Sequence, residues 1–232
     1  MKNWILAKVK SEEKNKGVTN YEDIFHSIAK KLMNEFQLQI NGKLFDFTEI
    51  EFYYFHKKHH PDCNVHQHKY QKKFSIYFHD KHGRGGVDIG FGDTECYGGI
   101  LIRGIKNEKE YIDGPIKVTD KICKVWSKKY DDLTDKNLLD NKICIESKEE
   151  TDECIFVGPR VGLVKNNKYL IKKFRFITHF KTEHKFKEKS LIFLFSKQCV
   201  ENNNILGFKK DTIIESLKNK DERSKEIYKL YQ

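Results

Sequence analysis

The stretch "KLFDFTEIEFYYF", residues 43–55, decides how the rest of the chain is organised. Hydrophobic and polar side chains alternate along much of it, and a period of two predicts a β-strand with one face in the protein core. On this strand Ile50 and Phe52 point to the core, while Glu49 and Glu51 point to the opposite face. That opposite face must meet water, a ligand or a positive charge, because a buried ionised carboxylate is costly without partners. A solvated sheet face and a functional site both remain open.

The remainder of the 232 residues contains patterns of both helix and strand. Hydrophobic residues at steps of four predict an amphipathic helix over residues 21–36. A second helix is expected over residues 114–126, because Pro115 suits a first helical turn, where its missing donor would be unpaired anyway. A third helix, rich in charge, is expected over residues 211–232. Short hydrophobic runs predict further strands at residues 73–79, 85–92, 97–105, 154–158, 169–180 and 190–196.

The sequence shows no internal repeat and no linker rich in Pro or Ser. We therefore expect one α+β domain over residues 1–205, followed by a helical extension over residues 206–232. The six cysteines lack C-x-x-C spacing, and a chain of this length can bury a core without disulfides, so reduced thiols are expected. Lysines interrupt the N-terminus before a signal-peptide core could form, and no run approaches a membrane-spanning length. The sequence predicts a cytoplasmic protein without a membrane partner.

Positive charge is in excess, with 44 Lys and Arg against 34 Asp and Glu and a formal net charge of +10. This excess favours a polyanionic partner such as nucleic acid, although a Lys-rich solvated surface explains it equally well. Residues 165–189 hold nine basic and two acidic side chains, interleaved with aromatic residues. Such a segment is typical of a phosphate-backbone contact, and core aromatics alternating with solvated lysines is the other interpretation. We take the lysines as candidate phosphate contacts and most of the phenylalanines as core.

Seven short motifs follow one another in a fixed order over most of the chain. Glu49, Glu51 and Tyr53 form an E-x-E-x-Y motif on the predicted strand, and a D-x-x-x-H motif formed by Asp62 and His66 follows it. The other motifs are "GGVDI", "GGILIRGI", "DGPIKV", "PRVGL" and "KKFRF". Taken in this order, the motifs resemble those of the alkyladenine (3-methyladenine) DNA glycosylase family.

The resemblance implies both a fold and a reaction. The fold is a single α+β domain with a curved mixed β-sheet and flanking helices, like the formyltransferase C-terminal-like architecture of that family. The reaction is monofunctional hydrolysis of the N-glycosidic bond of an alkylated or otherwise modified base, flipped out of double-stranded DNA. By resemblance Glu51 activates the attacking water, and a water nucleophile requires neither a Schiff-base lysine nor a cofactor. A monomer that acts in DNA repair or against foreign modified DNA is implied.

The resemblance also implies the walls of a base-binding pocket. Tyr53 corresponds to the ring on one side of the flipped base and His66 to the polar wall on the other side. Either Tyr77 or Phe78 completes the pocket. Arg103 corresponds to the arginine that ends the apolar strand, where a guanidinium would orient the glutamate or hold a phosphate. A structural ion pair at the end of a strand is the alternative for Arg103.

The chain departs from the family in its pocket and in its duplex-wedging segment. Asp88 stands where the family has an asparagine that crowds the amino group of guanine. Because an ionised Asp can only accept hydrogen bonds, we expect a base preference shifted toward an amino-bearing or otherwise modified base. In place of the family's tyrosine-rich wedge the chain has "FHDKHGRGG", in which Lys81, His82 or Arg84 fills the gap left by the base. The expected contacts to the DNA backbone are Lys81, Arg84, Lys117, Arg160, Lys172 and Lys173.

A second interpretation of the chain involves no catalysis. One loop is crowded with side chains of the kinds that bind zinc, namely His56, His59, His60, Cys63, His66 and His68. Four of them could close a tetrahedral site, although their spacing matches no paired zinc motif. The alternative is therefore a non-catalytic nucleic-acid-binding protein of the same fold with a structural zinc. Without zinc, these histidines line a loop that faces DNA.

Overall fold

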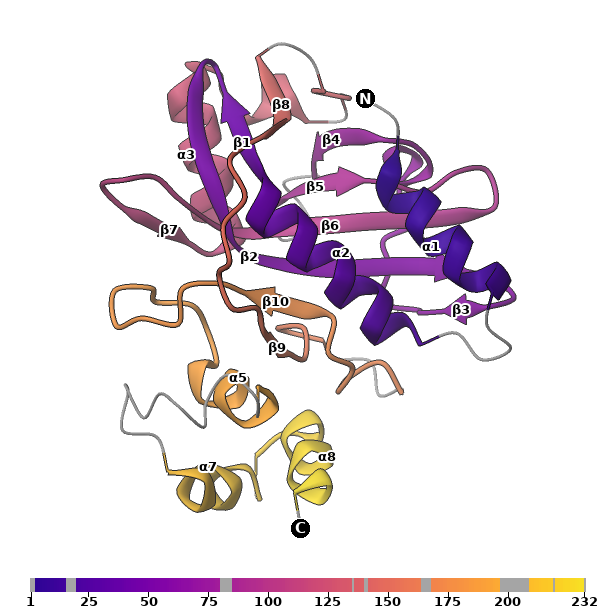
Figure 1. Ribbon diagram of the computed structural model, residues 1–232, viewed down its shortest axis with the longest axis vertical. Helices are drawn as coiled ribbons and strands as arrows, with labels where there is room; N and C mark the ends of the chain where they lie inside the picture. The colour runs from indigo at the N-terminus through magenta and orange to yellow at the C-terminus, as the bar shows by residue number, and fades with distance from the viewer. Residues whose placement is uncertain are drawn as a thin grey trace.

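The computed structural model describes most of the chain. The described residues are 3–15, 20–79, 85–134, 136–139, 142–163, 168–196, 209–218 and 220–231. They form an α+β fold built on one curled sheet (Figure 1). The strand expected over residues 43–55 is confirmed as β2 (Lys43–His56), which lies at the centre of the sheet and has partners on both edges.

The other strands are arranged around β2. Along one edge β2 pairs with β6 (Cys96–Lys106). Along the other edge it pairs in turn with β1 (Phe36–Ile40), β10 (Arg175–Ile177) and β3 (His60–Pro61). Beyond β6 the sheet continues through β5 (Val87–Gly90) and β4 (Ser75–Phe78). The remaining described strands are β8 (Ile143–Ser147) beside β1, β7 (Tyr111–Asp113) beside β6, and β9 (Phe156–Gly158) beside β10.

The sheet is curved, as expected, but it is antiparallel and not mixed. Every pair of named strands runs antiparallel. The parallel contact among the described residues is an isolated bridge between Phe78 and Thr134. Register shifts on β2 around Glu49 interrupt its ladder with β6. An irregularity of this kind bends a strand and re-aims its side chains, which suits a site on the curved face.

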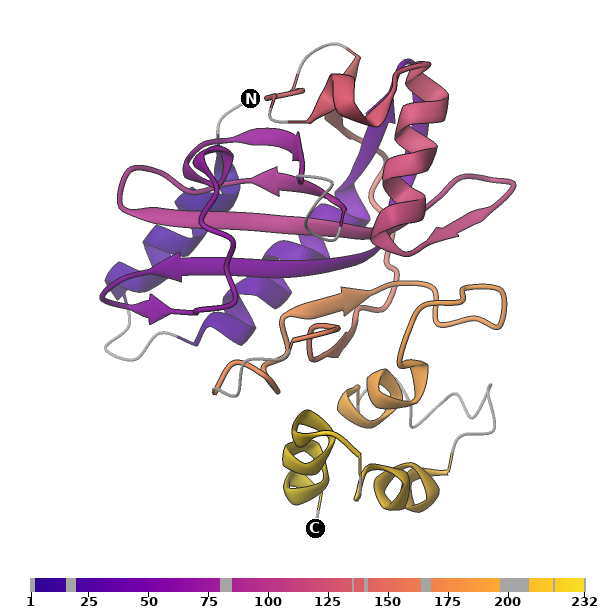
Figure 2. The same cartoon turned by 180° about the vertical axis from the view of Figure 1, so that it is seen from behind.

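Two helices lie across one face of the sheet (Figure 1). They are α1 (Trp4–Asn15) and α2 (Tyr21–Glu35), and α2 confirms the first predicted helix. The Phe25 ring of α2 stacks on Phe52 of β2 with 4.7 Å between the ring centroids. Ile50 and Phe52 are therefore in the core, as the alternation predicted. The carboxylates of β2 belong to the opposite face of the strand. Figure 2 shows the sheet from that side.

The second predicted helix is confirmed as α3 (Pro115–Trp126), with Pro115 as its first residue. Helix α3 packs beside β6 and β7 at one end of the sheet. Two short elements complete this part, a 3-10 turn η1 (Lys69–Lys72) before β4 and the single-turn helix α4 (Tyr130–Leu133) after α3. The N-terminus of α3 is thereby brought to the edge of the face that carries the β2 carboxylates.

Two of the expected strands differ from the structure. Residues 190–196 form a helix, α5 (Lys189–Phe195), because a short run that is apolar throughout has no periodicity to distinguish a strand from a buried helix. The strand expected over residues 169–180 shrinks to the three residues of β10.

The helix expected over residues 211–232 is two helices, α7 (Lys210–Leu217) and α8 (Glu222–Leu230). Asp221 begins the second helix, since its side chain accepts a hydrogen bond from the Ser224 N–H at 2.8 Å. Both helices share an apolar cluster with α5. The boundary expected between residues 205 and 206 lies outside the described residues and stays a prediction. Among the helices that are described, none is long and apolar enough to span a bilayer.

Candidate functional site

Side chains from five strands stand in one row on the face opposite α2. The register pairs Tyr77 with Asp88, and Asp88 with Leu101. It continues by pairing Leu101 with Glu51, and Glu51 with Arg175. Residues that are directly paired on neighbouring antiparallel strands project from the same face. The fold therefore brings distant parts of the sequence into one row, in which Leu101 separates Tyr77 and Asp88 from Glu51 and Arg175.

A pocket of about 810 Å³ lies on this face. Strands β2, β5 and β6 contribute to it, together with the loop after β3, the start of α3 and the segment after β9. Its volume falls within the range of about 300–1,000 Å³ that is typical of small-molecule sites. The residues that line the pocket include Tyr53, His66, His79, Asp88, Arg103 and Val161.

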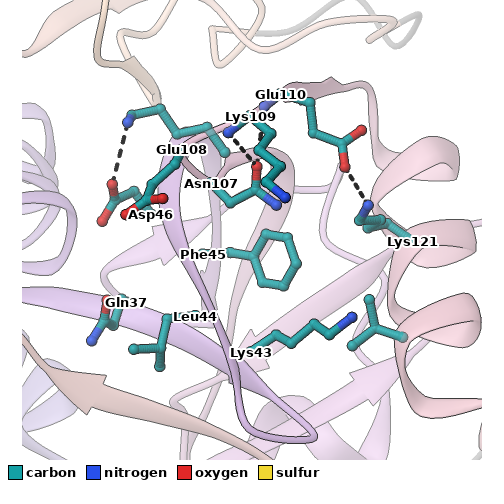
Figure 3. Close-up of a pocket in the computed structure, with 12 residues that line it drawn as sticks. Gln37, Lys43, Leu44, Phe45, Asp46, Asn107, Glu108, Lys109, Glu110 and Lys121 are labelled. Atoms are coloured by element: carbon teal, nitrogen blue, oxygen red, sulfur yellow. Dashed lines mark hydrogen bonds and ion pairs between the residues drawn. The ribbon is translucent and has the colours of Figure 1, made fainter.

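A second pocket, of about 630 Å³, lies where the β1–β2 turn, the β6–β7 turn and α3 meet (Figure 3). Four of its charged side chains form two ion pairs, Lys121 with Glu110, and Lys106 with Asp46 at 3.5 Å. Glu110 is 49% exposed, so water screens this pairing. None of the carboxylates that line this second pocket is buried. The pocket beside Glu51 is therefore the candidate site.

Glu51 is fully buried directly behind the wall of the candidate site. Its Oε1 accepts a hydrogen bond from the Val161 N–H at 2.7 Å, and its Oε2 accepts one from the Tyr53 hydroxyl at 2.9 Å. The Nε of Arg103 lies 3.3 Å from Oε1. Because these three partners all line the pocket, the carboxylate is one contact away from it. The interpretation of this strand face as solvated is wrong.

Glu49 lies beside Glu51 and is held by two arginines. Its Oε1 accepts hydrogen bonds from the Nε–H of Arg103 at 2.6 Å and the Nε–H of Arg175 at 2.8 Å. Burial opposes the charge, but Arg175 and Arg103 hold the pKa of the Glu49 carboxyl below its ordinary value. Burial also opposes the charge of Arg103, but Glu51 and Glu49 raise the pKa of its guanidinium. Arg103 thus contacts Glu51, as a role in orienting it requires, and also forms the structural ion pair with Glu49 that was the alternative.

Tyr53 is held by a buried arginine. The Arg160 guanidinium lies over the Tyr53 ring, 4.5 Å from the centroid, and its Nη2 is 2.7 Å from Oδ2 of Asp62. Burial first and the charge of Glu51 second raise the pKa of Tyr53 well above its ordinary value, so its hydroxyl remains a donor. Arg160 and Asp62 are both fully buried, each matched by the opposite charge. Arg160 is therefore not placed to contact DNA, contrary to the expectation from the sequence.

A stack of rings forms the wall around Asp88. The His79 ring stacks on Tyr77 with 5.5 Å between centroids, and on His66 with 5.7 Å. Oδ2 of Asp88 accepts hydrogen bonds from the Tyr77 hydroxyl at 3.0 Å and the Gln71 amide at 3.3 Å. Oδ1 lies 2.8 Å from Nε2 of His79. Burial opposes the charge of His79, but the Asp88 carboxylate raises the pKa of the imidazole above its ordinary value.

Sequence reasoning placed the wrong side chain of β4 in the pocket. Phe78 belongs to the main core, and Tyr77 is buried against Asp88 outside the pocket lining. His79 lines the pocket in their place. The signal that could have found it is the period of two, since His79 shares a strand face with Tyr77 while Phe78 points the other way. Tyr53, His66, Asp88 and Arg103 line the pocket, and their roles there stay predictions.

Basic side chains reach the pocket from two directions. Lys117 at the start of α3 and Lys187 before α5 both line it, and the sequence pointed to the first alone. Lys172 and Lys173, just before β10, lie elsewhere and contact the first turn of α2. The Nζ of Lys172 is 3.3 Å from Glu22, and the Lys173 N–H donates to the same carboxylate at 2.8 Å. The expected contacts and wedge candidates Lys81, His82 and Arg84 lie outside the described residues.

The histidines and the cysteine of the proposed zinc loop do not converge. Within the described ranges, which include all six, no group of three His, Cys, Asp or Glu side chains is placed to hold a metal ion. The His60 ring lies among Tyr21, Tyr54, Tyr169 and Phe174, and burial lowers the pKa of His60 to about 4. His56 accepts hydrogen bonds within its own turn, and His68 caps η1. The geometry gives His56, His60 and His68 local structural roles, while His66 lines the pocket.

Comparison with known proteins extends the description of the chain. No family model matches it. The "Uncharacterized protein L759" of Acanthamoeba polyphaga mimivirus is 33% identical to the chain over 172 residues, which cover 61% of this chain and 79% of the viral protein. The chain belongs to the family of this viral protein. Membership of this family assigns no activity, so the function has to be argued from the site.

Proposed function

We propose that the chain is a monofunctional DNA glycosylase, which hydrolyses the N-glycosidic bond of a modified base flipped out of double-stranded DNA. The observation that carries the proposal is the Glu51 carboxylate, fixed by Arg103, Val161 and Tyr53 at the wall of a pocket with room for a nucleobase. A carboxylate in this position can take the proton of an attacking water. Its negative charge also stabilises the positive charge that develops on the sugar as the base leaves.

The placement of the glycosylase-like motifs supports the proposal. The motifs lie on β2, in the loop after β3, on β5, on β6, at the start of α3, after β9 and on β10. Six of them contribute to the lining of one pocket, and the seventh supplies Arg175, which binds Glu49. Short motifs that match by chance are not expected to meet in one place. The curved antiparallel sheet with flanking helices is compatible with the glycosylase architecture.

The walls of the pocket suit an extruded base. Tyr53 offers a ring on one side, and His66 and His79 offer stacked imidazoles on another. A flipped base is held by stacking of this kind and by hydrogen bonds to its edge. Asp88 acts on base preference through His79, because its own oxygens are already engaged by protein side chains. This replaces the simpler idea of Asp88 as a free acceptor for the base.

One observation favours a second candidate, a non-catalytic nucleic-acid-binding protein. Both oxygens of Glu51 already accept hydrogen bonds, and the side chain is fully buried. A purely structural carboxylate would look the same. For catalysis, a water must take the place of the Tyr53 hydroxyl at Oε2 when the base enters, and catalytic hydrogen bonds of this kind are often completed by the substrate.

The two functions separate in an assay of base release. Duplex DNA carrying a single cationic alkylated purine, deaminated purine, etheno adduct or uracil is incubated with the protein, with unmodified duplex as the control. The proposal predicts free base together with abasic sites, and no protein–DNA adduct after borohydride reduction, because water and not a lysine attacks the sugar. Tight binding of the duplexes with no base released from any of them contradicts the proposal and supports the binding protein.

We expect Ile116 to take the place of the extruded base in the duplex. Of the large hydrophobic side chains that the described residues expose, Ile116 is the most exposed, at 58%, and it alone lines this pocket. An apolar side chain inserted between bases offsets a few kcal/mol of lost stacking, so Ile116→Ser should weaken binding of a modified duplex about tenfold or more. Fluorescence anisotropy measures the change. The control is Leu44→Ser, which removes a comparably exposed side chain from the other pocket; equal losses in both variants contradict the prediction.

A further inference from the structure

Asp88 and His79 form an acid–base pair at the pocket that the water-activating role of Glu51 does not use. Nε2 of His79 faces Oδ1 of Asp88 at 2.8 Å. This ion pair leaves Nδ1 as the nitrogen that Asp88 does not engage. The side chain of His79 is 22% exposed and lines the pocket, whereas Asp88 is 1% exposed. The imidazole is thus the member of the pair that a bound base can reach.

Three sets of contacts hold the Asp88–His79 pair in place. Tyr77 donates to Asp88 and stacks on His79, so it fixes both members. Gln71 donates to the same carboxylate oxygen as Tyr77. The backbone of His79 is tied at both ends, because its N–H donates to the Gly86 carbonyl at 2.9 Å and its carbonyl accepts from the Tyr130 hydroxyl at 2.7 Å. Such support is typical of a side chain whose orientation matters to chemistry.

We propose that His79 is the general acid of base release, delivering a proton from Nδ1 to the departing base while Asp88 holds the cationic imidazole. The inference rests on the proposed glycosylase function and deepens it. It applies to bases that are neutral in DNA, because such a base would leave as an anion, which is a poor leaving group unless it is protonated. An alkylated base that already carries positive charge leaves as a neutral molecule and needs no proton.

The step balances. The bond between C1′ of the sugar and the base nitrogen breaks, with its electron pair going to the base, and the base gains the proton from Nδ1. Water forms the new C–O bond at C1′ and gives its proton to Glu51. The products are the free base and an abasic sugar with a hydroxyl at C1′. His79 ends neutral and Glu51 protonated, and exchange with solvent restores both groups.

The contacts and the charge of His79 predict how the rate of base release depends on pH. The titratable side chains that contact the His79 ring, among the described residues, are Asp88, Tyr77 and His66. The pKa of His79 lies above its ordinary value of about 6.5, so the acid form persists toward neutral pH and is lost as the pH rises through the raised value. Release of a neutral base should therefore decline on the alkaline side, and release of a cationic base should not.

Single-turnover rates for a neutral deaminated purine and a cationic N7-alkylated purine, measured from pH 5.5 to 9 in the full chain, test the proposal. We expect His79→Gln to lower release of the neutral base by about 10²-fold or more, the usual contribution of a positioned acid, and to affect the cationic base far less. Asp88→Asn should move the alkaline limb of the neutral-base profile to lower pH, since it removes the charge that raises the pKa of His79. His26→Gln, at an exposed position of α2 beside Phe176 and outside the lining of the candidate site, is the matched control and should change neither rate.

Each outcome decides. If the rate of neutral-base release in the unsubstituted protein does not decline at alkaline pH, the assignment of His79 is overturned without any variant. An equal loss of rate on both bases in His79→Gln also overturns it. Release of cationic bases alone also overturns it and leaves the glycosylase function standing. Absence of release from every duplex overturns both proposals.

Discussion

Replacing Glu51 with glutamine is expected to lower the single-turnover rate of base release by about 10²- to 10⁴-fold, the range that a positioned general base contributes. Glutamine keeps the size of the side chain, and its amide oxygen can still accept from the Val161 N–H. It cannot take a proton from water, and it brings no negative charge to the sugar. The structure should therefore persist while the chemical step fails. Rates are measured with enzyme in excess over a modified duplex, and the fraction of abasic product is followed over time.

The matched control for this substitution is Glu215→Gln. Glu215 lies on α7 with 69% of its side chain exposed, and it pairs only with Lys218 among the described residues. The Glu215→Gln variant should release the nucleobase at the rate of the unsubstituted protein. Binding of the modified duplex should survive in both variants, because Glu51 lies behind the pocket wall and not at its surface. If the Glu51→Gln variant releases the nucleobase at the normal rate, Glu51 is not the general base of the reaction, whatever the substrate.

The central strand and its two faces could be predicted from the sequence because one local pattern decides both. Alternation along β2 separates Ile50 from Glu49 and Glu51, and burial of the apolar face fixes the register. The same rule, applied to β4, would have separated His79 from Phe78. It was not enough there, because Tyr77 and Phe78, the two residues that precede His79, are both aromatic and each could be given the role of a pocket wall.

The partners of the buried charges could not be predicted, because they depend on contacts between distant segments. Arg160 and Lys173 are both positively charged, yet Arg160 is fully buried against Asp62, while Lys173 is exposed beside the first turn of α2. A charge is stable inside a protein only where an opposite charge is already placed, and no local pattern shows that. The C-terminal helices show a similar limit, because the apolar run in α5 fits a strand or a helix equally well until α7 and α8 pack on it.

Arg175→Met is expected to lower the free energy of unfolding by about 3–5 kcal/mol, the usual result of removing one partner from a buried ion pair. Glu49 and Glu51 carry two negative charges, and Arg103 and Arg175 balance them. All four side chains are at least nine-tenths buried. Without Arg175 two buried carboxylates share one guanidinium. Chemical denaturation of the purified variant measures the loss, and Lys218→Met, which removes an exposed pair on α7, should cost about 1 kcal/mol or less.

The double variant Glu49→Gln/Arg175→Met separates charge balance from lost packing. It restores one negative and one positive charge in the cluster, so its loss of stability should be well below the sum of the two single losses. If the losses simply add, the charges are not coupled, and the explanation is wrong.

The pH dependence of stability gives an independent measurement. The pKa of Glu49 lies below its ordinary value of about 4.3, so the stability that its ion pairs contribute is present above that value and is lost as the pH falls through the lowered one. In Arg175→Met the pKa of Glu49 should rise, because one of the two charges that lower it is gone. The stability difference between the variant and the unsubstituted protein should therefore narrow as the pH falls below neutrality, and a difference that stays constant down to acid unfolding would show that Arg175 stabilises the fold by packing instead of charge.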